Sequence, residues 1–128
     1  MNIIYIDDDA TNRALLRDML AVEGYAVADA ADARTGLKMI EEGNFDLIFM
    51  DLRMPDMNGL TAIRQLRSGA SRGAHIPIVV VTADPSDGVK QMCRTAGADD
   101  FLEKPISMDR LFDIVSSARA AGKSRTAR

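Results

Sequence analysis

Residue types that mark whole classes of protein are scarce in this sequence of 128 residues. A single cysteine, Cys93, excludes an internal disulfide framework and fits a reducing cytoplasm. A single histidine, His75, argues against histidine-rich metal centres and against Ser-His-Asp hydrolysis. The net charge of -3 gives no basic signal for direct nucleic-acid binding.

Long apolar segments are also missing. The longest apolar run is about half a membrane span, so we expect neither a transmembrane helix nor a membrane partner. The N-terminus has no basic region and its apolar stretch ends at Asp7, so we expect no signal peptide. The hydrophobic share of 47% and the charged share of 27% are those of a globular chain, and the length predicts a single domain.

Short apolar runs alternate with helical patterns along the chain. The runs that predict strands are Ile3–Ile6, Ala26–Ala28, Leu47–Met50, Ile78–Val81 and Phe101–Leu102. The first, third and fourth are apolar at successive positions, which is typical of parallel strands buried on both faces. The second and fifth are weaker, so we expect them nearer the edges of the sheet.

An amphipathic stretch follows each predicted strand. Apolar side chains recur three or four residues apart, as at Val89, Met92, Cys93 and Ala96, which predicts helices. Asp32 and Ser107 are expected N-caps, and glycines such as Gly97 are expected helix ends. The order predicts a doubly wound α/β fold, a (βα)5 parallel sheet covered by helices on both faces. We expect this domain to span residues 1–120 and a flexible basic tail to span residues 121–128.

Polar side chains stand where the predicted strands end, which is where ligands bind in open parallel sheets. These residues are Asp7, Asp8 and Asp9 after the first strand, Asp51 after the third, Thr82 after the fourth and Lys104 after the fifth. Two carboxylates about 4 Å apart repel by about 4 kcal/mol at an effective dielectric near 20. One lysine cannot neutralise at least three acids, so the pattern predicts a divalent cation held by oxygen atoms, and Mg²⁺ fits best.

The predicted cation, lysine, hydroxyl and extra carboxylate together favour phosphoryl transfer. A carboxylate that is not used only as a metal ligand can act as the nucleophile and become an aspartyl phosphate.

In its segments 4–9, 46–59, 78–83 and 97–102 and in Lys104-Pro105, the chain resembles the receiver domain of two-component response regulators. The likeness covers about residues 1–120. It implies the flavodoxin-like, CheY-like fold with strand order 2-1-3-4-5. It also implies a phosphorylation-dependent signalling switch, which is not an enzyme beyond its own phosphoryl transfer and autodephosphorylation.

The resemblance implies roles for the acidic residues. Asp51 is the expected phosphoacceptor. Asp8, Asp51 and the backbone carbonyl of Arg53 are the expected Mg²⁺ ligands, and Asp7 is expected to orient metal-bound water.

It implies further roles around them. Lys104 is expected to pair with Asp51 and then with the phosphoryl group, and a cis peptide bond before Pro105 is expected to aim it. Thr82 is expected to bind a phosphoryl oxygen, and Phe101 takes the switch position that is often tyrosine in the family. Arg53 and Asp84 flank the expected path of the hydrolytic water. They either form a lid that prolongs phosphorylation or are two unrelated surface charges.

The resemblance also implies partners. A histidine kinase or histidine phosphotransfer protein is expected to supply the phosphoryl group, and an unknown protein target is expected to bind the face made by the fourth helix, fifth strand and fifth helix. We expect no output domain after Ala120. Met1 and the short tail favour a stand-alone regulator over a receiver excised from a hybrid kinase.

Two other functions compete with this interpretation. A haloacid-dehalogenase-type phosphatase would use Asp7 as nucleophile and Asp9 as acid–base, but it leaves Asp51 without a role. A receiver-like binding module that is never phosphorylated would have lost acidic or lysine positions, and this chain keeps them.

Overall fold

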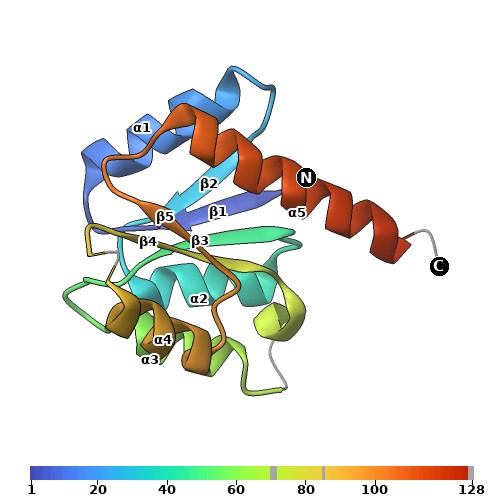
Figure 1. Ribbon diagram of the computed structural model, residues 1–128. Helices are drawn as coiled ribbons and strands as arrows, with labels where there is room; N and C mark the ends of the chain where they lie inside the picture. The colour runs from blue at the N-terminus through green and yellow to red at the C-terminus, as the bar shows by residue number, and fades with distance from the viewer. Residues whose placement is uncertain (70–71, 85, 127–128) are drawn as a thin grey trace.

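The protein forms one parallel β-sheet with helices on both faces, as a computed structural model of residues 1–69, 72–84 and 86–126 shows (Figure 1). The strands are β1 (Ile3–Ile6), β2 (Val27–Ala30), β3 (Leu47–Asp51), β4 (Ile78–Thr82) and β5 (Asp100–Glu103). Their order is β2-β1-β3-β4-β5, which confirms the predicted fold and places the two weak runs at the edges.

Two layers of helices cover the sheet. The helices are α1 (Ala10–Ala21), α2 (Ala33–Glu42), α3 (Gly59–Leu66), α4 (Asp87–Ala96) and α5 (Met108–Thr126), and a short 3-10 helix, η1, spans Arg72–His75. Figure 1 shows α1 and α5 on one face and α2, α3 and α4 on the other. The sheet is therefore buried from both sides, as the continuous apolar strands require.

Alternation along the strands divides the core in two, because successive side chains of a strand point to opposite faces. Ile4 and Ile6 of β1 belong to the core under α2, α3 and α4, whereas Ile3 and Tyr5 belong to the core under α1 and α5. The Tyr5 ring meets the Phe49 ring edge to face, with centroids 6.4 Å apart. Tyr5 is thus fixed in direction, and its hydroxyl lies near the carboxyl end of β1.

The ends of the helices mostly follow the predicted signals. Asp32 caps α2 by accepting a hydrogen bond from the Thr35 N–H at 2.7 Å, and Ser107 accepts one from the Arg110 N–H at 3.5 Å. Gly97 ends α4 with a φ of 122°, a value that favours glycine.

The C-terminus differs from the prediction. Helix α5 continues past Ala120 to Thr126, so the tail expected to be flexible from residue 121 is helical as far as Thr126. This stretch contains the basic residues Lys123 and Arg125, and basic residues favour the last turns of a helix. Residues 127–128 lie outside the described residues, and the domain boundary at residue 120 stays a prediction. Among the described helices, none has the length and apolarity needed to cross a membrane.

Candidate functional site: an acidic cluster at the carboxyl edge of the sheet

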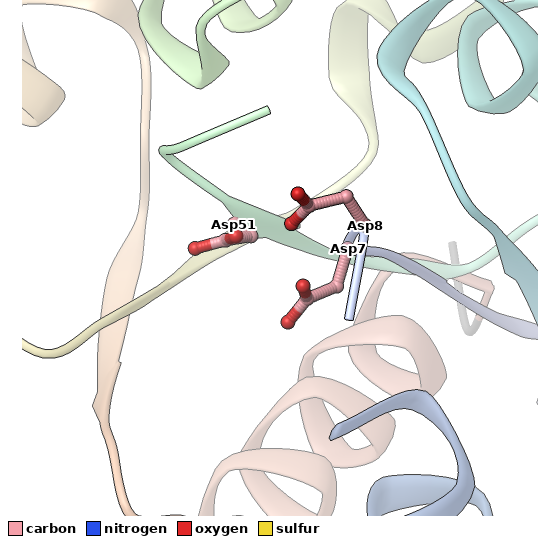
Figure 2. Close-up of side chains that lie close together, drawn as sticks. All are labelled: Asp7, Asp8 and Asp51. Carbon is pink, nitrogen blue, oxygen red and sulfur yellow. The ribbon is translucent and has the colours of Figure 1, made fainter. Parts of the chain in front are cut away.

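Three carboxylates meet at the carboxyl ends of β1 and β3. These strands are neighbours, and Ile6 pairs with Met50, so the next residue on each strand, Asp7 and Asp51, lies beside the other. One carboxylate oxygen from each of Asp7, Asp8 and Asp51 lies within 4.8 Å of the others (Figure 2). Asp7 and Asp51 are buried and Asp8 is exposed. The structure therefore brings together three of the four acids that the sequence singled out.

Lys104 reaches this cluster from the end of β5. Its Nζ lies 3.2 Å from Asp51 Oδ1, as predicted, and also 3.4 Å from Asp7 Oδ2, which was not predicted. The peptide bond between Lys104 and Pro105 is cis, as expected. One ammonium group thus faces both buried carboxylates.

Asp7 is surrounded by donors. Its Oδ1 accepts a hydrogen bond from the Asp9 N–H at 2.9 Å, and its Oδ2 accepts from the Tyr5 hydroxyl and, at 3.4 Å, from Asn12 Nδ2. Arg13 Nη1 donates to the Asp7 carbonyl at 2.7 Å. Sequence reasoning missed Tyr5, Asn12 and Arg13. The available signal was a hydroxyl in an otherwise aliphatic strand, two residues before the acid.

These contacts separate the buried acids electrostatically. Burial alone would raise the pKa of Asp7, but hydrogen bonds from Tyr5 and from the Asp9 N–H, together with the charge of Lys104, lower that pKa. Burial and the negative charge of Asp7 raise the pKa of Asp51 above its usual range, against the effect of Lys104. Asp7 is therefore a firmly held anion, whereas Asp51 carries a charge that its surroundings compensate less well.

The pKa values of Lys104 and Tyr5 are both raised. Burial disfavours the charged form of Lys104, but Asp51 and Asp7 outweigh that effect and raise the pKa of the ammonium group. Burial and the hydrogen bond to Asp7 raise the pKa of Tyr5. Lys104 is therefore a cation and Tyr5 a neutral donor.

The chemistry of the donor set fits a hard divalent cation. Asp7, Asp8 and Asp51 offer only oxygen atoms, and Asp8 faces solvent. A cavity of about 450 Å³ lies over them and is also lined by Arg53 and Thr82. Oxygen ligands that leave room for water suit Mg²⁺.

Thr82 ends β4 at the same edge and is buried. Its Oγ1 accepts a hydrogen bond from the Asp84 N–H at 3.0 Å. The Asp84 carboxylate accepts from the Ser86 N–H at 3.1 Å, and no ion pair joins it to Arg53, both residues being described. Arg53 and Asp84 both line the cavity. Their effect on the lifetime of a bound phosphoryl group stays a prediction.

A second cavity, of about 470 Å³, adjoins α4, β5 and the start of α5. Phe101 lines it and is 8% exposed. Lys90 Nζ lies 5.9 Å from the centre of the Phe101 ring and Arg94 Cζ lies 5.1 Å from it, within the range of cation–π contacts. Thr82 and Lys104 line both cavities, and they link the acidic cluster to this face.

Asp9 has a structural task. Its Oδ1 accepts a hydrogen bond from the Thr11 N–H at 2.8 Å and caps α1. In the phosphatase alternative, Asp9 would act as acid–base and Asp7 as nucleophile. Asp7 is fully buried and its oxygens are taken by donors. The geometry therefore gives that alternative no support.

Relatives in sequence agree with this geometry. A family model described as the response regulator receiver domain matches residues 3–116. The chain is 39% identical over 111 residues to the response regulator MprA of Mycolicibacterium vanbaalenii, covering 87% of this chain and 47% of that protein. It is 35% identical over 115 residues to the CAI-1 autoinducer sensor kinase/phosphatase CqsS of Vibrio cholerae, covering 90% of this chain and 17% of that protein. This chain thus spans less than half the length of both relatives.

Solved structures share the fold. The chemotaxis protein CheY4 of Vibrio cholerae matches with a TM-score of 0.85 at 28% identity, over 91% of this chain and 97% of that one. The receiver domain of the sensor histidine kinase PA1611 of Pseudomonas aeruginosa, which has a magnesium ion in its active site cleft, matches with a TM-score of 0.82 at 31% identity, over 91% and 94%. With the strand order and the family match, these likenesses show that the chain belongs to the response regulator receiver domains of two-component systems.

Proposed function

We propose that this receiver domain accepts a phosphoryl group on Asp51 and signals through the face that contains Phe101. The observation that carries the proposal is the setting of Asp51. Its carboxylate lies 3.2 Å from the Lys104 ammonium group and in one cluster with Asp7 and Asp8, below an open cavity. Phosphoryl transfer requires a nucleophile, a cation and acids that can hold a metal ion, and residues of all three kinds lie at this edge of the sheet.

In the proposed reaction, an Asp51 oxygen attacks the phosphorus of a phosphohistidine. The new P–O bond forms as the P–N bond breaks, and the imidazole leaves with its electron pair. When bound, Mg²⁺ supplies positive charge next to the phosphoryl oxygens, and the residues that would hold it are Asp8, Asp51 and the Arg53 carbonyl, with Asp7 behind them. Lys104, already beside Asp51, balances the charge of the product.

The proposed readout starts at Thr82. Its hydroxyl turns toward a phosphoryl oxygen. This movement breaks the hydrogen bond that the hydroxyl accepts from the Asp84 N–H in this structure. Because Thr82 and Phe101 line the same second cavity, this movement changes the space open to the Phe101 ring. A protein target is expected to detect the change on the surface of α4, β5 and α5.

The names of the relatives support the partners that we propose. The matched proteins include a response regulator and a sensor kinase/phosphatase, and the PA1611 receiver domain holds magnesium. We therefore expect a histidine kinase or histidine phosphotransfer protein as donor. A cytoplasmic site of action belongs to the same proposal, and the free, buried Cys93 is consistent with it.

The test is the intact mass of the chain after incubation with phosphoramidate. The wild type should gain one phosphoryl group with Mg²⁺ and lose that gain with a chelator. Asp51→Asn should gain none, whereas Asp18→Asn, which changes an exposed acid on α1, should behave like the wild type. A gain that persists in Asp51→Asn, or that ignores the chelator, would exclude Asp51 as the Mg²⁺-dependent acceptor.

A further inference from the structure

A buried tyrosine lies directly behind the acidic cluster. Tyr5 stands on β1, two residues before Asp7, and its hydroxyl donates a hydrogen bond to Asp7 Oδ2. Both residues are 0% exposed, so water cannot replace this donor. The edge contact with Phe49 holds the ring, and so the hydroxyl can serve Asp7 only from this direction.

The hydroxyl and a metal ion would act on the same negative charge. Asp7 Oδ2 also faces Lys104 Nζ at 3.4 Å and Asn12 Nδ2 at 3.4 Å, so this oxygen is already supplied with donors when no metal is bound. A hydrogen bond to an ionised carboxylate is stronger than one to a carboxylate whose charge a cation has partly neutralised. The Tyr5 bond is therefore stronger in the metal-free protein.

We infer that Tyr5 is a positioning residue that weakens Mg²⁺ binding by stabilising the Asp7 carboxylate in the metal-free state. The inference rests on the proposed function, because it concerns the same metal site. Any contact that is stronger in the metal-free protein must lower the affinity for the metal by the same coupling free energy. Tyr5 thereby sets how much Mg²⁺ the chain needs before Asp51 can be phosphorylated.

The experiment removes only the hydroxyl. Tyr5→Phe keeps the ring against Phe49, and the Mg²⁺ dissociation constant is measured by titrating the backbone amide signals of the whole chain in NMR. We expect Tyr5→Phe to bind Mg²⁺ roughly three- to tenfold more tightly, since a charge-assisted hydrogen bond is about twice as strong as a neutral one. An unchanged or weaker affinity in Tyr5→Phe overturns the inference.

Tyr25 offers a matched control. It is the other tyrosine of the sequence, and its hydroxyl accepts a long hydrogen bond from Arg119 at 3.4 Å, away from the acids. Tyr25→Phe should leave the Mg²⁺ affinity unchanged. If the wild type itself binds no Mg²⁺, the proposed function fails; if the wild type binds Mg²⁺ and Tyr5→Phe binds it equally, only the role of Tyr5 fails.

Two further measurements separate this role from packing. Tyr5→Phe should be less stable than the wild type without metal, and saturating Mg²⁺ should narrow that gap. A loss of packing alone would lower the free energy of unfolding by the same amount with and without Mg²⁺. In the wild type, the hydroxyl proton of Tyr5 should move upfield in the NMR spectrum on adding Mg²⁺, and a fixed or downfield-moving signal contradicts the inference even if the variant does not fold.

Discussion

At the scale of single residues, Asp8 is the acid of the cluster without a nearby cation. Lys104 lies beside Asp7 and Asp51, whereas within the described residues no basic side chain pairs with the exposed Asp8. The charge of Asp8 therefore opposes folding of the metal-free chain and is relieved by a bound cation. We predict that Asp8→Asn raises the metal-free melting temperature by about 3 °C, the equivalent of about 1 kcal/mol of repulsion near solvent.

The same substitution should abolish the rise in melting temperature that Mg²⁺ gives the wild type. Both quantities are read from thermal unfolding followed by circular dichroism, with and without Mg²⁺. Asp18→Asn, which removes an exposed charge on α1, should keep the Mg²⁺ response. A metal-free Asp8→Asn chain that melts below the wild type would show that the three acids do not repel one another significantly.

The sequence predicted which acids meet but not what holds them. Asp7, Asp51, Thr82 and Lys104 each follow or end a strand, and parallel strands bring their carboxyl ends to one edge. The second contact of Lys104, with Asp7, depends on the reach of one flexible side chain. The hydroxyl of Tyr5 could not be placed for a similar reason, because an apolar run predicts burial of the ring and says nothing about its polar end.

At the scale of elements, the loop between β3 and α3 supplies a second cap to α2. Asp56 Oδ1 accepts a hydrogen bond from the Ala33 N–H at 3.2 Å and Oδ2 accepts one from the Arg34 N–H at 3.0 Å. These are first-turn N–H groups, which the helix itself cannot satisfy. The loop that carries Arg53 toward the cavity is thus tied to the start of α2.

This cap predicts a pH dependence of stability. The N–H of Arg34, the largest cause, and that of Ala33 lower the pKa of Asp56. Because the folded-state pKa lies below the unfolded value of about 3.9, the cap contributes fully above that value and is lost as the pH falls through the folded pKa. Asp56→Asn should therefore be less stable than the wild type at neutral pH, and the difference should shrink below about pH 4.

The measurement is the urea midpoint of both chains at neutral and acidic pH. Asparagine keeps the size of the side chain but only one oxygen acceptor, so the substitution removes the charge of Asp56 together with one of its two hydrogen bonds, as protonation of Asp56 also would. The difference in midpoint between Asp18→Asn and the wild type should not change comparably with pH, since the exposed Asp18 carboxylate does not cap the start of a helix. A difference between Asp56→Asn and wild type that stays constant with pH would rule out the charged cap.

The sequence predicted a helix or strand well where its apolar pattern and its end signal agreed, and less well where one of the two was missing. Strand β1 and helix α4 have a clear apolar pattern and a clear end, and both were placed correctly. The last turns of α5 have no apolar partner in the sequence pattern, so they were expected to fray. Helix α5 nevertheless continues to Thr126, after a turn that contains Ala118, Ala120 and Ala121, all of high helix propensity.

At the scale of the whole molecule, the cavity over the acidic cluster and the cavity at the α4–β5–α5 face are lined by two of the same residues. Thr82 and Lys104 line both cavities, and Phe101 lies in the second one beneath Lys90 and Arg94. Figure 1 shows β4 and β5 side by side between α5 and α4, so a change at the end of β4 acts next to both helices. The fold therefore offers a short path from Asp51 to a surface that a partner can bind.

We predict that beryllofluoride with Mg²⁺, a mimic of the phosphoryl group, moves amide NMR signals across α4, β5 and the start of α5. The cations over the Phe101 ring report its movement, so the signals of Lys90 and Arg94 should shift together with that of Thr82. Phe101→Ala removes the ring and should confine the shifts to Asp7, Asp8, Asp51 and their neighbours. The same variant should still gain one phosphoryl group in the phosphoramidate experiment. Shifts at Lys90 and Arg94 that are equal in Phe101→Ala and wild type would show that the conformational change reaches α4 without Phe101.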